Sequence, residues 1–278
     1  MAFHLIQGTF HVAGYSPDGD SIRFKAKDIG NWSLLGGYPP KLNSKGHVQL
    51  RLEAIDTLET HFQDTHQPLE LARAAMNHLM AQLGIENVAW NAANTKIESA
   101  KDGTPGYVIA REVEKNGRPV AFAFAGDSGQ GDGVRVFFDA DLALNSVNAE
   151  MLGSGLAYPT FYKGLFSDLR QALAQEDGQA RAMRLGIWAK DATNSGFVAD
   201  SLSAIAEDYV ILPKLFRRLA VYLEGGGAAS GFKGYLEQLA EEVLVISTAH
   251  TTHFDTLVEE RGNRLRLVEP PENVVFAG

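Results

Sequence analysis

The chain has 278 residues, of which 45% are hydrophobic and 21% charged, a formal net charge of -9 and no cysteine. This length suits one domain with large insertions or two small domains, and the composition excludes wholesale disorder. The lack of cysteine excludes disulfide scaffolds, thiolate zinc sites and cysteine nucleophiles. The acidic balance argues against coating of duplex nucleic acid through charge alone, although not against an enzyme that holds one phosphate at a time.

The N-terminal segment lacks the basic region and the long apolar run of a secretory signal. No apolar run approaches the roughly 18 residues that a membrane-spanning helix needs. We therefore expect a soluble, cytoplasmic protein without a membrane partner. The sequence leaves the oligomeric state open.

The N-terminal part has the pattern of short strands separated by turns. Residues 9–15 and 21–26 have β-type composition, and the Ser-Pro-Asp-Gly-Asp run that ends at Asp20 is typical of a turn between them. Residues 29–47 are rich in Gly, Pro, Asn and Ser, which predicts a long loop.

A clearer strand follows this loop. Apolar and polar side chains alternate over residues 48–54, which is the period of a half-buried strand. The alternation places Arg51 on the face opposite the apolar side chains. Asp56 and Glu59 follow where this strand ends.

Strands give way to helices before residue 190, and this order indicates an α+β protein. The helix expected first begins with a proline, and the Asn-Gly pair before Arg118 is a hairpin signal. The expected elements are a helix, three strands and two helices, over residues 68–83, 106–113, 119–125, 134–138, 146–155 and 168–185.

The pattern changes after a short polar stretch, residues 191–196, which is a possible linker. We expect a C-terminal α+β extension over residues 197–278, as an accessory segment whose role the sequence does not reveal. Its helices are expected over 199–223, with a break at Pro213, and over 231–241, and a hairpin is expected around residue 262.

Three acidic and two basic side chains sit next to turns and strand ends: Asp20, Asp56, Glu59, Arg51 and Arg118. Calcium prefers carboxylate and carbonyl oxygens, and a further carboxylate can orient or deprotonate a water. Arginine binds two phosphate oxygens at once and stabilises the charge that grows on them. Taken singly, each residue is explained as well by an ordinary turn, loop or hairpin charge.

The combination of segments is more specific, because five of them, in order, resemble the staphylococcal nuclease (thermonuclease) family. The five segments are Asp18-Gly19-Asp20-Ser21, Arg51 to Thr60, Lys115-Asn116-Gly117-Arg118, Val147 to Ala157 and Ala180 to Trp188. The segment Val147 to Ala157 resembles the family's Val-Asn helix with its Gly-Leu-Ala ending, and the segment Ala180 to Trp188 resembles its closing Gly-Ile-Trp helix.

The resemblance implies a calcium-dependent nuclease that hydrolyses phosphodiester bonds of DNA or RNA by attack of water. Asp20 and Asp56 would bind Ca²⁺ through carboxylates and Thr57 through its main-chain carbonyl, with no other cofactor. Glu59 would position or activate the water. The preference for DNA or RNA, and for internal or terminal bonds, stays open.

The resemblance also implies the groups that bind the nucleic acid substrate. Arg51 and Arg118 would clamp the phosphate and stabilise its transition state, so that with Glu59 they form the catalytic set. Lys115 and Tyr162 are weaker candidates for contacts with a substrate phosphate or base.

The fold that the resemblance implies is a five-stranded OB-type β-barrel packed on helices, as a catalytic domain over residues 1–190 followed by the segment 197–278. Leu58 stands where the family has proline, Asn116 where it has a nucleotide-stacking tyrosine, and Pro119 where it usually has glycine.

Alternatives remain open at three places. A nuclease-fold module that binds nucleic acid or protein without catalysis is the main rival to the enzyme. The pair His250 and His253 could suggest a metal, but an exposed loop is the better interpretation. The basic group Lys214, Arg217 and Arg218 could touch a nucleic-acid backbone, but a solvated helix face is the better interpretation.

Overall fold

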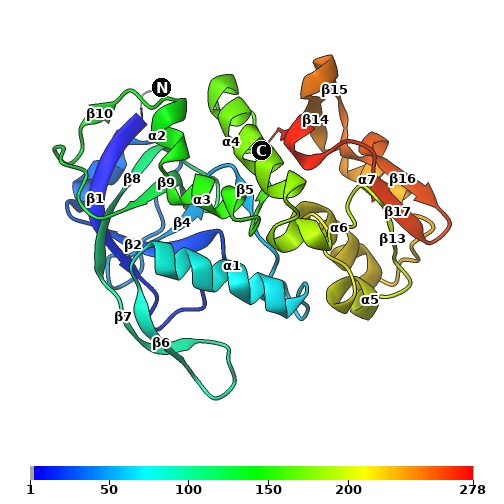
Figure 1. Ribbon diagram of the computed structural model, residues 1–278, viewed down its shortest axis with the longest axis horizontal. Helices are drawn as coiled ribbons and strands as arrows, with labels where there is room; N and C mark the ends of the chain where they lie inside the picture. The colour runs from blue at the N-terminus through cyan, green and yellow to red at the C-terminus, as the bar shows by residue number, and fades with distance from the viewer. Residues whose placement is uncertain (1–2, 278) are drawn as a thin grey trace. The chain divides into compact units, whose positions relative to one another are not determined.

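The computed structural model describes residues 3–277 and divides into two compact units (Figure 1). The barrel unit comprises Met1–Glu53 and Met76–Met151, and the C-terminal unit comprises Ala54–Ala75 and Leu152–Gly278. These bounds differ from those of the two domains expected from the sequence, and a division near residue 190 stays a prediction.

Five strands of the barrel unit close into a barrel in the order β1-β2-β4-β9-β8, because β8 pairs back onto β1. The pairing of β4 with β9 is parallel and the other four are antiparallel. The closed barrel with added strands and helices confirms the predicted α+β class and the OB-type barrel. Its strands are β1 (Phe3–His11), β2 (Ser21–Ala26), β4 (Val48–Leu52), β8 (Thr104–Val113) and β9 (Pro119–Ala125).

The barrel interior follows from the alternation of side chains along these strands. In β4 the apolar residues are buried, whereas Gln49 and Arg51 are half-buried on the other face, as predicted. Phe10, Phe24 and Phe122 are fully buried. Burial of one such ring contributes about 2–3 kcal/mol, which accounts for the sequence forming a filled barrel rather than an open sheet.

Two predicted elements of this unit need correction. The strand expected over residues 9–15 begins at Phe3 and ends at His11. The loop expected over 29–47 contains a 3-10 helix, η1 (Ile29–Leu34), and the short strand β3 (Gly36–Gly37). The helix η1 forms because the Asp28 side chain accepts a hydrogen bond from its first turn and because Trp32 is buried edge-on against Phe24.

Shorter elements complete the barrel unit, and two helices contribute residues to both units. The shorter elements are β6 (Glu86–Trp90), β7 (Ile97–Lys101), β10 (Arg135–Val136) and α2 (Ala140–Leu144). The helices shared by both units are α1 (Leu69–Gln82) and α3 (Val147–Gly153).

Within the described residues, the C-terminal unit consists of helices and three small sheets. Two of the sheets have the strand orders β12-β18-β14-β15 and β13-β17-β16, and the third is the pair β5 and β11. Its helices are α4 (Ser167–Ala182), η2 (Gly186–Ala189), α5 (Leu202–Glu207), α6 (Pro213–Glu224), α7 (Phe232–Leu239), η3 (Ile246–Thr248), η4 (Phe254–Leu257) and η5 (Pro271–Asn273). Its strands are β5 (Ile55–Asp56), β11 (Tyr158–Pro159), β12 (Phe161–Tyr162), β13 (Phe197–Val198), β14 (Glu242–Val245), β15 (His250–His253), β16 (Val258–Arg261), β17 (Arg264–Leu267) and β18 (Val274–Phe276).

One hydrophobic core holds the C-terminal unit together. Leu58, Ala72 and Tyr158 lie in it, as do many apolar residues beyond position 196, among them Phe216. Side chains of the expected catalytic domain and of the expected accessory segment therefore share this core. Among the helices of the described residues, none has the length and apolar character that crossing a membrane requires.

Candidate functional site

The eight site residues predicted from the sequence divide equally between the two units. The barrel unit holds Asp20, Arg51, Lys115 and Arg118. The C-terminal unit holds Asp56, Thr57, Glu59 and Tyr162.

In the barrel unit, strand pairing brings Asp20 close to Arg51. The turn that ends at Asp20 is closed by a bridge between Asp18 and Ser21, and Ser21 lies opposite Arg51 in the pairing of β2 with β4. The Leu52 N–H donates to the Asp20 carbonyl at 2.9 Å. Asp20, at the end of the turn before β2, and Arg51, in β4, thus lie close together along the backbone at one point of the barrel.

Arg118 immediately precedes β9, which begins at Pro119. The second residue of this strand, Val120, lies opposite Arg51. The Arg118 Nε donates to the Glu114 carboxylate at 3.0 Å, and the Asn116 amide donates to the same carboxylate at 2.7 Å. Burial raises the pKa of Glu114, but the hydrogen bond and charge of Arg118 lower it more, so that its pKa is below the usual value.

Glu114 therefore belongs to the candidate site, although the sequence analysis did not single it out. Its position four residues before Arg118 across a hairpin turn was a usable signal. Lys115 lies beside it in the turn and is exposed.

In the C-terminal unit, Asp56 and Thr57 are buried at the end of the short strand β5. Asp56 lies opposite Tyr158 in the pairing of β5 with β11. Gln67 fixes the loop that carries Glu59, because the Gln67 N–H donates to the Glu59 carbonyl at 2.9 Å and the Glu59 N–H donates to the Gln67 side chain at 3.3 Å. The backbone around both carboxylates is therefore held in place.

Arg217 of α6 binds both of these carboxylates. Its Nη1 and Nη2 donate to the two oxygens of Asp56 at 3.0 and 2.7 Å, and Nη1 also donates to Glu59. Such a two-pronged pairing is among the strongest ion pairs in proteins. Burial lowers the pKa of Arg217, but the charges and hydrogen bonds of Asp56 and Glu59 outweigh burial and hold that pKa well above its usual value.

The interpretation of Lys214, Arg217 and Arg218 as a solvated helix face is wrong, because acidic partners lie against all three. Lys214 is buried, forms an ion pair with Glu241 and lies 4.3 Å from the centroid of the Phe276 ring. Arg218 pairs with Glu241 at 3.0 Å. The acidic partners of these three basic residues lie in other segments of the sequence. The sequence therefore revealed only the helical spacing of the three basic residues.

Two further sequence hypotheses concern Tyr162 and the histidine pair. The Lys214 ammonium lies 3.5 Å from the Tyr162 hydroxyl. His250 and His253 are exposed at the two ends of strand β15, so the expected loop is a strand. In the described part of the chain, no cluster of three or more His, Cys, Asp or Glu side chains could hold a metal ion.

The fit of calcium can be tested on the donor chemistry of the predicted ligands. Asp20, Asp56 and the Thr57 carbonyl offer the hard oxygen atoms that calcium takes. The Thr57 hydroxyl is buried and has no hydrogen-bond partner within residues 3–277, so one polar atom beside Asp56 is unsatisfied. The donors fit calcium in kind, while Arg217 binds both oxygens of the Asp56 carboxylate.

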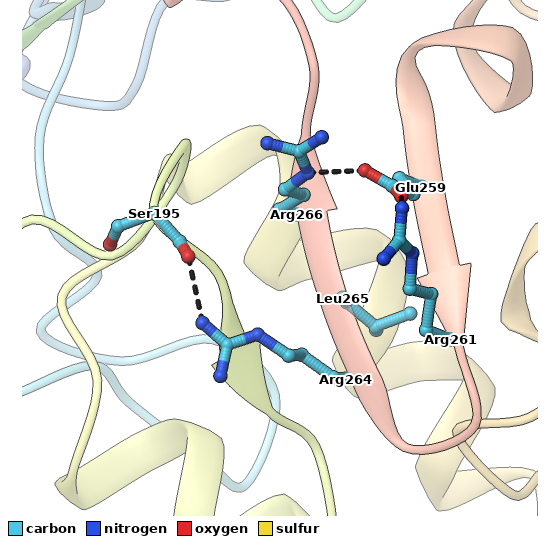
Figure 2. Close-up of a pocket in the computed structure, with 6 residues that line it drawn as sticks. All are labelled: Ser195, Glu259, Arg261, Arg264, Leu265 and Arg266. Atoms are coloured by element: carbon cyan, nitrogen blue, oxygen red, sulfur yellow. Dashed lines mark hydrogen bonds and ion pairs between the residues drawn. The ribbon is translucent and has the colours of Figure 1, made fainter.

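A second basic feature of the C-terminal unit is a cavity of about 310 Å³ over strands β16 and β17 (Figure 2). Arg264 donates to the Ser195 carbonyl at 2.9 Å, and Glu259 pairs with both Arg261 and Arg266. Three positive charges and one negative charge line this cavity, although the whole chain is acidic. This arginine pocket was missed in the sequence, where the alternation in Arg-Leu-Arg-Leu was its only signal.

Comparison with known proteins does not assign the chain to a family. No protein-family model matches the chain, and no curated protein matches it either.

Proposed function

We propose that the chain is a calcium-dependent nuclease that hydrolyses phosphodiester bonds of DNA or RNA by attack of water. The observation that carries this proposal is the closed five-stranded barrel, whose neighbouring strands bring Asp20 and Arg51 together and start β9 directly after Arg118. The same residues carry the resemblance to staphylococcal nucleases.

The residues have distinct roles in the proposed reaction. Arg51 and Arg118 bind the non-bridging phosphate oxygens and stabilise the negative charge that grows on them. Glu59 accepts the proton of the attacking water. Asp20, Asp56 and the Thr57 carbonyl would hold calcium, which when bound supplies positive charge to the phosphate and acidifies water.

The decisive experiment compares the wild type with Glu59→Gln on single- and double-stranded DNA and RNA, with calcium, magnesium or a chelator. We expect cleavage by the wild type with calcium and a loss of kcat of about 100-fold or more in the variant, because general base catalysis is worth about 10²–10⁴-fold. Glu70→Gln, at an exposed position in α1, is the matched control. The proposal fails if the wild type with calcium cuts none of the four substrates, or if Glu59→Gln cuts as fast as the wild type.

A second candidate function is binding of nucleic acid without catalysis. It is favoured by one observation, the pairing of Arg217 with both Asp56 and Glu59, which neutralises two of the acidic residues that the nuclease needs. This module would bind DNA or RNA with the same dissociation constant with and without calcium, and it would leave the strands intact.

A further inference from the structure

Arg217 belongs to the segment 197–278, for which the sequence suggests no role. It lies 161 residues from Asp56 and 158 residues from Glu59 along the chain, yet it binds both. The side chains of Asp56 and Glu59 are only 4% and 13% exposed, so that water screens these charges little. The two acids are thus paired with a residue outside the segments that resemble nucleases.

We propose that Arg217 competes with a divalent cation for the carboxylate of Asp56, so that the C-terminal segment sets the cation affinity of the site. This inference rests on the proposed function, because it takes Asp56 as a cation ligand. Arg217 is then a positioning residue that acts through Asp56 and Glu59.

Competition follows from the geometry of the ion pair. The guanidinium donates to both oxygens of Asp56, and calcium would have to lie at roughly 2.3–2.6 Å from at least one of them. A cation there would face a second positive charge across the same carboxylate, with little solvent between the two. Binding of the cation and retention of the Arg217 contact therefore oppose each other.

In the proposed exchange the Arg217 side chain moves and α6 stays in place, because the apolar face of this helix is packed in the core. In α6 the apolar residues Leu215, Phe216 and Leu219 are fully buried. The Arg217 side chain is 27% exposed, so that part of it already borders solvent while α6 is held by its buried face. Since Nη1 also binds Glu59, the same movement releases the proposed base.

Calcium titration by calorimetry tests the competition without any measurement of activity. Arg217→Met keeps the length of the side chain and removes the charge, and we expect it to bind calcium at least about tenfold more tightly than the wild type. Arg218→Met is the matched control, because the neighbouring arginine pairs with Glu241 instead, and its calcium affinity should equal that of the wild type.

A second variant keeps the test valid if Arg217→Met does not fold, since removal of one partner of a buried ion pair is costly. Arg217→Lys retains the positive charge but lacks the planar fork, so its calcium affinity should lie between those of the wild type and Arg217→Met. Calcium should also raise the midpoint of thermal unfolding more in Arg217→Lys than in the wild type, because tighter binding stabilises the folded state more.

The possible results separate the two proposals. If the wild type binds calcium and the Arg217 variants bind it equally or less tightly, the competition is overturned and the nuclease proposal stands. If neither the wild type nor the variants bind calcium, the competition is overturned together with the calcium dependence of the proposed function. Tighter binding in both Arg217 variants, but not in Arg218→Met, supports the competition.

Discussion

The carboxyl group of Asp177 in α4 is fully buried, and burial raises its pKa from 3.8 to about 8. Arg181, 3.6 Å away, lowers this pKa without offsetting burial. The unfolded chain loses the proton near pH 4 and the folded protein near pH 8, so the folded state binds the extra proton between these values. Stability contributed by this group is therefore fully present below pH 4 and is lost as the pH rises toward 8.

Asp177→Asn should remove this loss, because the amide stays neutral at every pH. We expect its free energy of unfolding to exceed that of the wild type by several kcal/mol at pH 8, because one pKa unit corresponds to about 1.4 kcal/mol, with a smaller difference at pH 5. Urea unfolding at both pH values measures it, and Asp168→Asn, at an exposed position of the same helix, is the control. A variant less stable than the wild type at pH 8 would contradict the protonated carboxyl.

His47 in the barrel unit has the opposite dependence on pH. Burial, the stacked ring of His11 and nearby lysines lower its pKa to about 4, although Asp102 opposes this shift. His47 binds a proton near pH 6.5 in the unfolded chain but only near pH 4 in the folded protein. Stability is therefore lost as the pH falls through this window. We expect His47→Gln to lose about 1 kcal/mol less than the wild type between pH 7 and pH 5. Equal losses, measured by urea unfolding, would count against this assignment.

At the level of secondary structure, the hairpin of β16 and β17 presents the arginine pocket to solvent. Arg261 and Arg264 lie opposite each other, and Arg266 lies opposite Glu259 two pairs further along. If the substrate or ligand is a nucleic acid, its phosphates are the chemistry that suits three guanidinium groups.

We expect simultaneous replacement of these three arginines by alanine to weaken nucleic-acid binding. The slope of the logarithm of affinity against the logarithm of salt concentration should fall by roughly one for each phosphate that the variant no longer binds. Fluorescence anisotropy with labelled single-stranded DNA at several salt concentrations measures both quantities. Arg73→Ala removes a surface charge elsewhere and should change neither. An unchanged slope in the triple variant would show that the arginine pocket does not bind nucleic acid.

Elements with strong local signals were predictable from the sequence, and contacts between distant segments were not. The alternation in β4, the helix α1 and the start of α6 at Pro213 follow from periodicity and proline chemistry within a few residues. The helix η1 depends on burial of Trp32 against another strand, which composition does not encode. For the site, the turn at Asp20 was visible locally, whereas the ion pair of Arg217 depends on tertiary packing.

For the whole molecule, the shared core of the C-terminal unit decides what a truncated chain can do. Deletion of every residue after Asn194 would remove many buried apolar side chains, among them Phe197, Phe216, Phe232 and Phe276. Tyr158 and Ala180 would then be deprived of much of the core that surrounds them. Each ring that is removed takes away about 2–3 kcal/mol, and four rings together approach the 5–15 kcal/mol that stabilise a typical domain.

We therefore expect the chain 1–194 to lose the fold of the C-terminal unit rather than to remain a smaller nuclease. Near-ultraviolet circular dichroism should lose the signal of Tyr158 and Trp188, whose rings pack at 5.0 Å, and limited proteolysis should cut between residues 152 and 194. Phe216→Leu in the full chain is the matched control, because it keeps the segment, retains most of the buried volume and should preserve both readouts. If the chain 1–194 resists the protease and unfolds cooperatively at the wild-type midpoint, the segment 197–278 is an accessory that the rest of the chain does not need for folding.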